Sequence, residues 1–333
     1  MRTWMMSLPI LDAFAGGRAD RVPFWEVWYA MSGLTRAILG RAAETPEDLC
    51  ALAEALGWDA ISAGGVNINA PWGGSSTASD GTDHYVPRGM KALEGLHDRP
   101  FPDQSQNLAR ARAVAEAAHA HGIAAVLYLP WCFHTITTTV GLGALGLAVY
   151  DDRERLHDAF EWVEQRSRRA IKEVAIPSGV DLVLFDGDCA FKTGLMVRPD
   201  IFRELVFERT ARTVELLKDA GIPYVMHSDG KLDELIPMLV ELGFAAVHGV
   251  EAQANDLAEI KARFGRQITL IGNMDVVFLA HADISQVREA TLTMLRTGSP
   301  GGRYVAACNT SPLDYIPQEN YVAFAQTIRD FRP

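Results

Sequence analysis

The feature that most constrains the fold is an alternation of short apolar runs with longer amphipathic ones along the whole chain. Eight apolar runs have the length and composition of strands, and stretches with helical periodicity separate them. These runs are residues 22–28, 59–63, 123–130, 181–186, 224–228, 245–250, 268–273 and 304–308. Strands that alternate with helices form a parallel sheet covered by helices, so the pattern predicts an α/β fold.

The number of repeats predicts how that sheet is closed. Eight repeats in one chain favour a (β/α)8 TIM barrel over an open doubly wound sheet. No glycine-rich GxGxxG turn follows the first strand-like run, which disfavours a dinucleotide-binding fold. No linker interrupts the pattern, so residues 1–333 are predicted to form a single domain.

The segment 67–103 is rich in glycine, serine and proline and follows the second strand-like run. Loops that follow barrel strands cover the active face, so this segment is a candidate lid. Its composition fits a surface insertion equally well.

Composition limits the classes of partner. The formal net charge of −11 argues against nucleic acid or an anionic membrane as the main partner, because both repel an acidic surface. No run approaches the roughly 20 apolar residues that cross a bilayer, so no membrane insertion is expected. The four cysteines are far apart and include no CxxC pair, which is typical of a reducing cytoplasm. We therefore expect a cytoplasmic protein that acts on a small molecule.

Polar residues gather at the ends of the strand-like runs, where a parallel barrel carries its active site. They recur at six of the eight strand ends, which is more than turns require. These residues are Glu26, Asp186, Asp188, His227, Asp229, His248, Glu251, Asn273, Asp275, Cys308 and Asn309.

The histidine and aspartate in "YVMHSDGKLDEL" are separated by one residue. Side chains at positions i and i+2 of a strand share a face, so His227 and Asp229 can converge on one point. Glu251 and Cys308 follow later strands of the same barrel. Imidazole, two carboxylates and a thiolate together satisfy a tetrahedral zinc ion, so these four residues are predicted to be metal ligands.

Each of these residues also has a simpler interpretation. Asp229 or Ser228 could cap a helix that begins near Lys231, as short polar side chains often do. Cys308 could be a small buried residue and His248 a half-buried core residue. All of these interpretations would have to hold at one end of one barrel, and this coincidence favours a site.

The chain resembles the uroporphyrinogen decarboxylase superfamily and, within it, the corrinoid- and thiol-dependent methyltransferases. The resemblance covers almost the whole chain, most specifically residues 179–320, and implies the same (β/α)8 barrel. The stretches that carry it are "GRADRVPFW", "GVDLVLFDGDCAFKTGLMVRPDIFREL", "GIPYVMHSDGKLDELIPMLVELGFAAVHGVEAQANDLAEIKARFG", "ITLIGNMD" and "GGRYVAACNTSPLDYIPQEN".

The resemblance also implies a ligand set. In the methyltransferases, and in the similar zinc domain of cobalamin-independent methionine synthases, zinc is held by a His-x-Cys pair, a later acidic residue and a later cysteine. His227 matches the histidine, Glu251 the acid and Cys308 the last cysteine, while Asp229 stands where the first cysteine is expected. Carboxylate oxygen is an ordinary zinc ligand, although it makes the site harder and more anionic.

The function implied is a zinc-dependent methyltransferase. It would move a methyl group between a corrinoid, such as methylcobalamin on a partner protein, or a methylated small substrate, and a thiol-type acceptor. Catalytic roles are then expected for Asp186, Asp188, Asn273 and Asp275, and substrate contacts for Glu26, Trp28 and His248.

Two alternatives remain open at this point. One is a lyase of the decarboxylase type that acts on a small carboxylate. Uroporphyrinogen itself is disfavoured, because the arginines of the decarboxylase N-terminus and its acid after the second strand are missing. The other is a catalytically silent, metal-binding accessory protein.

Overall fold

The computed structural model describes residues 8–17, 20–71, 75–77 and 83–333. The candidate lid 67–103 is therefore covered only in part, since 72–74 and 78–82 lie outside the described residues. Its described part includes a two-stranded antiparallel hairpin and two short 3₁₀ turns. The hairpin strands and turns are β2 (Ser75–Thr77), β3 (Asp83–Tyr85), η1 (Met90–Leu93) and η2 (Leu96–Asp98).

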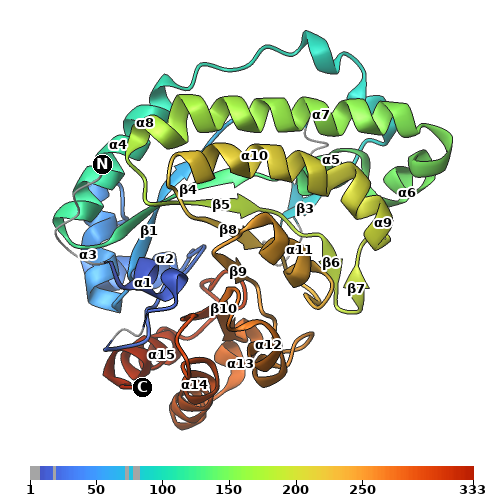
Figure 1. The fold of residues 1–333 in the computed structure, drawn as a ribbon. Coiled ribbons are helices and arrows are strands. Elements are labelled where there is room, and N and C mark those ends of the chain that lie inside the picture. Colours follow the sequence, from blue (N-terminus) through green and yellow to red (C-terminus); the bar gives the residue numbers. More distant parts are fainter. Residues whose placement is uncertain (1–7, 18–19, 72–74, 78–82) are drawn as a thin grey trace.

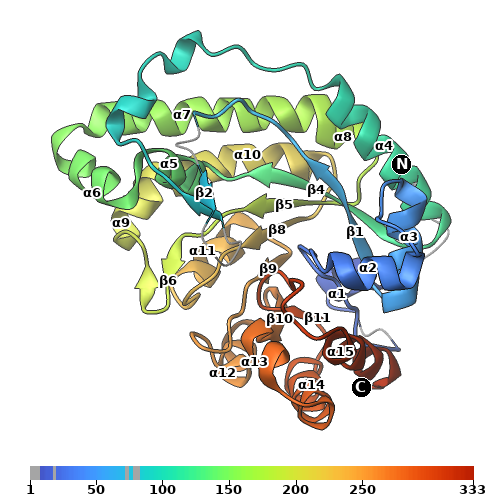
Figure 2. The same ribbon diagram turned by 180° about the vertical axis from the view of Figure 1, so that it is seen from behind.

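The centre of the molecule is a parallel sheet of seven strands in the order β1-β4-β5-β8-β9-β10-β11. Successive strands of this sheet are neighbours, and every pair is parallel. The sheet curls, and helices lie along its outer side (Figures 1 and 2). The strands are β1 (Ala60–Gly65), β4 (Ala124–Pro130), β5 (Leu182–Asp186), β8 (Tyr224–His227), β9 (Ala246–His248), β10 (Thr269–Met274) and β11 (Tyr304–Cys308). A second small hairpin consists of β6 (Ala190–Phe191) and β7 (Gly194–Leu195).

The expected closed barrel of eight strands needs correction, because residues 22–28 do not form a regular strand. One parallel bridge pairs Phe24 with Ala306 of β11. On the other side, the Asp59 N–H donates to the Phe24 carbonyl at 2.7 Å. Pro23 has no N–H to donate, which limits ladder pairing here. The fold is therefore TIM-barrel-like, with an irregular segment between its two edge strands.

Fifteen α-helices and two π-helical turns are found in the described residues. Several have clear end signals: Thr45 and Asp48 form a capping box at the start of α3, and Gly243 ends α11 with φ of 80°. The helices are α1 (Pro9–Ala15), α2 (Ser32–Leu39), α3 (Pro46–Leu56), α4 (Ser105–Ala120), α5 (Cys132–Val140), α6 (Leu142–Asp151), α7 (Arg153–Ala170), α8 (Ile176–Ser178), α9 (Pro199–Phe202), α10 (Glu208–Asp219), α11 (Leu235–Leu242), α12 (Leu257–Phe264), α13 (Val276–His281), α14 (Ile284–Gly298) and α15 (Gln318–Asp330), and the π-helical turns are η3 (Ile171–Ala175) and η4 (Arg203–Phe207).

Two apolar clusters separate the inside of the curled sheet from its outside. The inner cluster joins alternate strand residues such as Val225, Val305 and Ala307 to α1, which lies against β11. The outer cluster contains the intervening residues, among them Ala306 and Cys308, packed against the helices. Because strand side chains alternate between two faces, this division fixes which strand-end residues can reach the interior.

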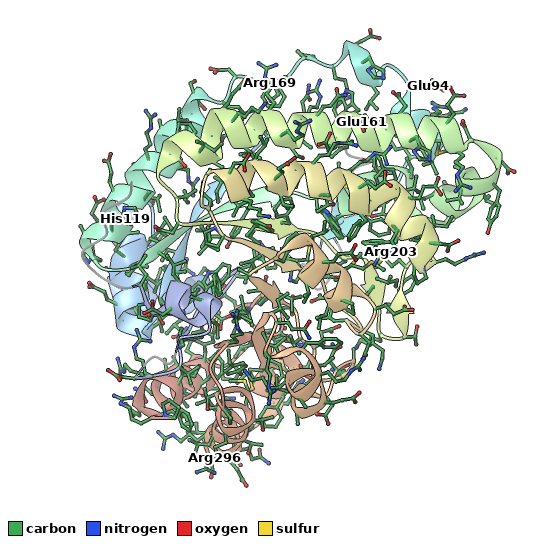
Figure 3. The ribbon with its side chains drawn as sticks, in the orientation of Figure 1. Glu94, His119, Glu161, Arg169, Arg203 and Arg296 are labelled. Carbon is green, nitrogen blue, oxygen red and sulfur yellow. The ribbon has the colours of Figure 1, made fainter. Side chains whose placement is uncertain are left out.

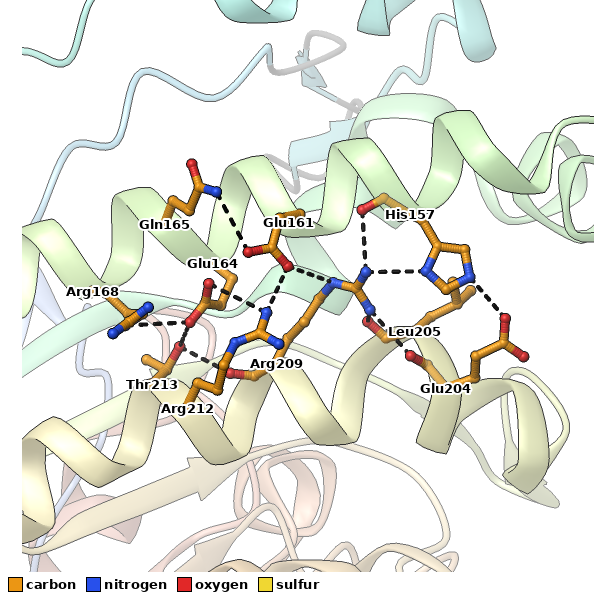
Figure 4. A network of polar contacts seen from close by, with 10 residues as sticks. All are labelled: His157, Glu161, Glu164, Gln165, Arg168, Glu204, Leu205, Arg209, Arg212 and Thr213. Atoms are coloured by element: carbon orange, nitrogen blue, oxygen red, sulfur yellow. Dashed lines mark hydrogen bonds and ion pairs between the residues drawn. The ribbon is translucent and has the colours of Figure 1, made fainter.

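The outer helix layer is held by polar contacts as well as by apolar packing. Between α7 and α10, the buried Arg209 donates to the Leu205 carbonyl at 3.0 Å and contacts His157, while Arg212 bonds Glu161 (Figure 4). Side chains on the outer surface, such as the labelled Arg296, extend from the helices into solvent (Figure 3).

No single helix of the described residues is long and apolar enough to cross a membrane. Within this described part of the chain, α5 and α6 are long and apolar enough only when taken together, and they are bent by 99° at the break between them.

We predict that Asp59→Ala loosens the connection between residues 22–28 and β1. The Asp59 carboxylate is buried and accepts hydrogen bonds from Arg21 at 2.8 Å and from the Phe24 N–H at 2.8 Å. Its loss leaves a buried N–H and a partly buried guanidinium without their acceptor, so the free energy of unfolding should fall by about 2–3 kcal/mol. Urea unfolding followed by tryptophan fluorescence measures the change.

The matched control is Asp158→Ala. That aspartate pairs with His97 on the surface, where both side chains are more than half exposed, and exposed pairs contribute little to stability. Equal midpoints for the two variants would contradict the structural role of Asp59.

Candidate metal centre

The last residues of three neighbouring strands lie at the same height, at the carboxyl end of the sheet. Asp186 of β5 pairs in register with His227 of β8, which pairs in register with His248 of β9. His227 has the strand parity of Val225, a member of the inner apolar cluster. The register and parity therefore direct this group of polar side chains toward the inside of the curled sheet.

A compact set of possible ligands lies at this end. Asp188, His227 and Asp229 each offer one atom, and these atoms all lie within 4.8 Å of one another. The His227 Nε2 is 3.5 Å from the Asp188 Oδ1 and 3.9 Å from the Asp229 Oδ1. The imidazole is 7% exposed and the carboxylates are 36% and 34% exposed, so the cluster is closed on the histidine side and reachable on the carboxylate side.

The loop after β8 is held by hydrogen bonds that position Asp229. Its N–H donates to the Asp188 Oδ1 at 2.9 Å, and the next N–H, of Gly230, donates to the Glu251 Oε2 at 2.7 Å. The Asn255 amide in turn donates to the Gly230 carbonyl at 2.8 Å. These contacts draw three carboxylates together around one loop.

Gly230 is required where this loop passes the β6–β7 hairpin. Its φ is 90°, a conformation that L-residues rarely adopt, and a Cβ there would lie 2.4 Å from the Ala190 carbonyl oxygen. The "DG" of the sequence motif therefore serves a close backbone approach.

The charge around Asp229 is unbalanced. Burial raises the pKa of its carboxyl to about 8, the negative charges of Asp188 and Glu251 add to this, and only Lys192 opposes it. The Asp229 Oδ1 is buried and has no hydrogen-bond partner among the described residues. A partnerless carboxylate oxygen next to other carboxylates is an environment that a bound cation stabilises, so the donor set fits a metal ion.

The histidines are neutral, as metal ligation requires. Burial lowers the pKa of His227 to about 3, with a further contribution from the charge of His134. Burial also lowers the pKa of His248 well below its ordinary value. The Trp28 ring packs edge-to-face on His227, with ring centroids 4.4 Å apart, and lies 6.0 Å from the His248 ring.

The helix-cap interpretation of "HSDG" does not hold. Helix α11 begins at Leu235, several residues after the motif, and no side chain caps it. The Ser228 hydroxyl instead accepts from the Cys189 N–H at 3.0 Å. Neither Ser228 nor Asp229 therefore serves as an N-cap.

Cys308 lies apart from the cluster. It has the parity of Ala306 and is fully buried in the layer between the strands and the helices. Its N–H donates to the Glu26 Oε2 at 3.2 Å, and its thiol forms a hydrogen bond with the same carboxylate. Burial raises the pKa of this thiol well above its ordinary range. The structure brings His227 and Asp229 together and places Glu251 beside them, whereas a ligand role for Cys308 stays a prediction.

The other predicted substrate contacts are divided between two places. Trp28 and His248 lie at the cluster, and both ring nitrogens of His248 are bonded within the protein. Glu26 lies with Cys308, where it accepts from the Tyr321 hydroxyl at 3.2 Å and burial raises its pKa to about 8. Its substrate role stays a prediction.

Asn273 and Asp275 line a cavity of about 790 Å³ between α12 and α14. The Asp275 carboxylate accepts from the Val277 N–H at 2.8 Å and so caps α13. None of the three cluster residues lines this cavity. The catalytic roles predicted for Asn273 and Asp275 therefore stay predictions without support from this geometry.

His134, which follows β4 on α5, is a residue of this site that no sequence motif indicated. Its Nδ1 accepts from the Asp188 N–H at 3.2 Å, so it positions the loop that carries this carboxylate. The glycine of "DGD" was a weak signal of a close approach by another segment. A Cβ at Gly187 would lie 2.1 Å from the His134 Cβ. The neighbouring Asp186 is largely buried, and burial together with the charge of Asp188 raises its pKa to about 6.

The fold and this centre define a class: parallel, TIM-barrel-like α/β proteins with an acidic, histidine-containing site at the carboxyl ends of the strands. Residues 136–331, more than half of the chain, match the family described as uroporphyrinogen decarboxylase (URO-D). The chain belongs to the uroporphyrinogen decarboxylase family, as the sequence motifs indicated.

Solved structures resemble the fold at low sequence identity. A methyltransferase from Methanosarcina mazei is 17% identical and has a TM-score of 0.70, with 97% of this chain and 98% of that chain covered. A 3-keto-D-glucoside 4-epimerase from E. coli is 9% identical, with a TM-score of 0.45 and coverage of 94% and 100%. A psychrophilic endo-beta-1,4-xylanase of glycoside hydrolase family 10 is 9% identical, with a TM-score of 0.46 and coverage of 98% and 100%. No curated protein sequence matches the chain.

We predict that Asp229→Asn stabilises the metal-free protein. The amide removes one of three crowded negative charges and can donate to Asp188 or Glu251, so the free energy of unfolding should rise by about 1 kcal/mol. The pKa of Asp229 is higher in the folded protein than in the unfolded one, so the ionised form destabilises the fold. The advantage of the variant should therefore be absent in acid and grow as the pH rises toward about 8.

Urea unfolding after treatment with a chelator, at several pH values, measures this difference. Asp158→Asn is the surface control. A variant less stable than the wild type throughout the range would show that the charge of Asp229 is compensated within the protein.

Proposed function

We propose that the protein is a metal-dependent methyltransferase. It moves a methyl group between a corrinoid, or a methylated small substrate, and a thiol-type acceptor. The observation that carries the proposal is the Asp188–His227–Asp229 cluster, with its partnerless buried oxygen, at the strand ends where this fold places its chemistry. The family membership and the similarity in fold to a protein described as a methyltransferase support it.

The metal would be held by His227 and by the carboxylates of Asp188 and Asp229, with Glu251 next to them. One nitrogen and several oxygen donors suit zinc and also harder divalent ions. Zinc is the first candidate because the methyltransferases that the sequence resembles use it. Three protein ligands leave a position open for a substrate. When bound, the ion lowers the pKa of an acceptor thiol and so supplies a thiolate near neutral pH.

The surrounding residues of the chain orient the substrate and manage the proton. Trp28 covers the His227 ring and excludes water from that side of the site. Asp186, whose pKa is raised to about 6 by burial, is suited to take the proton that an acceptor thiol loses near neutral pH. Asp188 both faces the His227 Nε2 and fixes the Asp229 backbone, so it couples the two sides of the cluster.

The donor would reach the cluster from the side on which the carboxylates are exposed. A corrinoid protein that presents methylcobalamin is one donor of this kind, and a small methylated compound is the other. The protein would carry out this reaction in the cytoplasm, as its spaced, reduced cysteines suggest.

One observation favours a second candidate, a decarboxylase-type lyase for a small carboxylate. Lys192 is near enough to Asp229 for its charge to lower the pKa of that carboxyl, and it also donates to Gln253. A cation at this rim could bind a substrate carboxylate. The third possibility, a silent metal-binding accessory protein, keeps the ion and lacks turnover.

We expect the purified protein to hold about one equivalent of a divalent metal, zinc first. His227→Ala and Asp229→Asn should each reduce the bound metal to near the background level, because each removes a donor from a three-residue set. Cys308→Ala should retain the metal, since its sulfur lies with Glu26 in the outer layer. Elemental analysis of the three variants and the wild type decides the ligand set.

Loss of metal from Cys308→Ala, in a variant that still folds, would return that sulfur to the ligand set. A wild-type protein without metal, even after reconstitution, would favour the metal-free lyase.

We expect the metal-loaded protein to transfer methyl groups from methylcobalamin to one or more members of a panel of thiols. Asp229→Asn should lower the rate at least about 100-fold, because the acceptor loses activation by the ion. Asp158→Asn, on the surface, should keep the wild-type rate. Mass spectrometry of the methylated thiol measures transfer. Full metal content without turnover on any thiol or methyl donor would instead support the accessory protein.

A further inference from the structure

Two buried imidazoles and a backbone carbonyl form a chain of hydrogen bonds behind the cluster. The Nδ1 atoms of His227 and His248 are 2.8 Å apart, and the His248 Nε2 is 3.2 Å from the Cys308 carbonyl oxygen. Both histidines are buried, so water does not compete for these contacts.

The chemistry of the chain fixes the position of each proton. A carbonyl oxygen can only accept, so the His248 Nε2 must carry the hydrogen that it donates to Cys308. A neutral imidazole has one N–H, so the His248 Nδ1 is bare and accepts. The proton between the two Nδ1 atoms therefore belongs to His227.

The opposite arrangement would make His248 an imidazolium. That cation would be fully buried, with the neutral His227 and one carbonyl as its hydrogen-bond partners. Burial of a charge without a counter-ion is costly, and the His248 side chain is almost completely buried.

The consequence appears on the other side of the His227 ring. With the hydrogen on Nδ1, the Nε2 carries a lone pair, and it faces the Asp188 Oδ1 at 3.5 Å and the Asp229 Oδ1 at 3.9 Å. Three electron-rich atoms then point toward one place, where a cation could bind all three. A hydrogen on the His227 Nε2 would remove one of these three donors. Trp28 packs against the His227 ring and lies near the His248 ring, so it resists a ring flip that would turn the His227 Nδ1 away from His248.

We propose that His248 is a positioning residue, which together with the Cys308 backbone carbonyl fixes the hydrogen of His227 on Nδ1 and leaves Nε2 bare toward Asp188 and Asp229. The assignment of the bare nitrogen to a metal rests on the proposed function. The tautomer itself does not, since it follows from contacts within the protein.

Long-range ¹H–¹⁵N spectra of the chelator-treated protein, labelled with ¹⁵N-histidine, test the tautomer directly. The chain has nine histidines, and the signals missing from His227→Ala assign the ring in question. We expect His227 in the Nδ1–H form in the wild type. An Nε2–H form would overturn the proposal whether or not the protein binds metal.

Two substitutions at His248 test its role. His248→Phe keeps a ring but removes the acceptor, so the Nε2–H form of His227 should grow and zinc affinity should fall about 10- to 100-fold. His248→Gln supplies an amide that can both accept from His227 and donate to Cys308, so it should restore the Nδ1–H form and most of the affinity. Competition with a chromogenic zinc chelator measures affinity without any assay of activity.

The outcomes separate this inference from the proposed function. A wild type with the Nδ1–H tautomer but no zinc affinity would remove the metal function and leave the tautomer assignment standing. Unchanged tautomer and affinity in a folded His248→Phe would overturn the positioning role while the metal function stands. If His248→Phe does not fold, the wild-type spectrum and His248→Gln still decide: poor zinc affinity in a folded glutamine variant that keeps the Nδ1–H form would overturn the role.

Discussion

The alternation of side chains along parallel strands is the constraint on which the candidate site depends. On β8 and β9 it turns His227 and His248 toward the inside of the sheet, at equal height because the two residues are paired in register. On β11 it turns Cys308 outward, to Glu26 and α15. One geometric rule thus both assembles the cluster and places the Cys308 side chain on the other face of the sheet.

The cluster is also a place where stability and function oppose each other. Three carboxylates are drawn together around one loop by backbone hydrogen bonds that neutral amide oxygens could also accept. The result is a buried oxygen without a partner and a raised carboxyl pKa, both unfavourable for the fold alone. Such concentrations of unfavourable charge are typical of sites that receive a ligand, and here they are the strongest physical argument for a cation.

Much of the fold could be predicted from the sequence. Seven of the eight strand-like runs are strands of the sheet, because apolar runs between amphipathic helices have few other places to lie. The exception, 22–28, contains Pro23 and pairs with β11 by a single bridge. Closure of a barrel depends on hydrogen bonds between the first and last strands, and composition carries no information about these.

The site was predictable where it follows from spacing along one strand. The i, i+2 relation placed His227 and Asp229 together. Asp186 at the end of β5 and Asp188 just after it were recognised as a pair, and Asp188 joins the cluster. Cys308 required knowing which face of β11 is inner, a fact set by the whole sheet. His134 lies on a helix within an apolar pattern, so its contact with Asp188 appears only when the chain is folded.

The hydrogen-bond chain behind His227 shows a further limit of reading residue types. The contribution of position 308 to this chain is a carbonyl oxygen, which every amino acid possesses, whereas the contribution of position 248 needs a side chain that accepts and donates at once. A cysteine at 308 draws attention as a possible ligand, yet the atom of that residue that contacts His248 is its backbone carbonyl oxygen. The residue type at a strand end does not by itself say which of its atoms faces the site. What the site can bind depends on that atom.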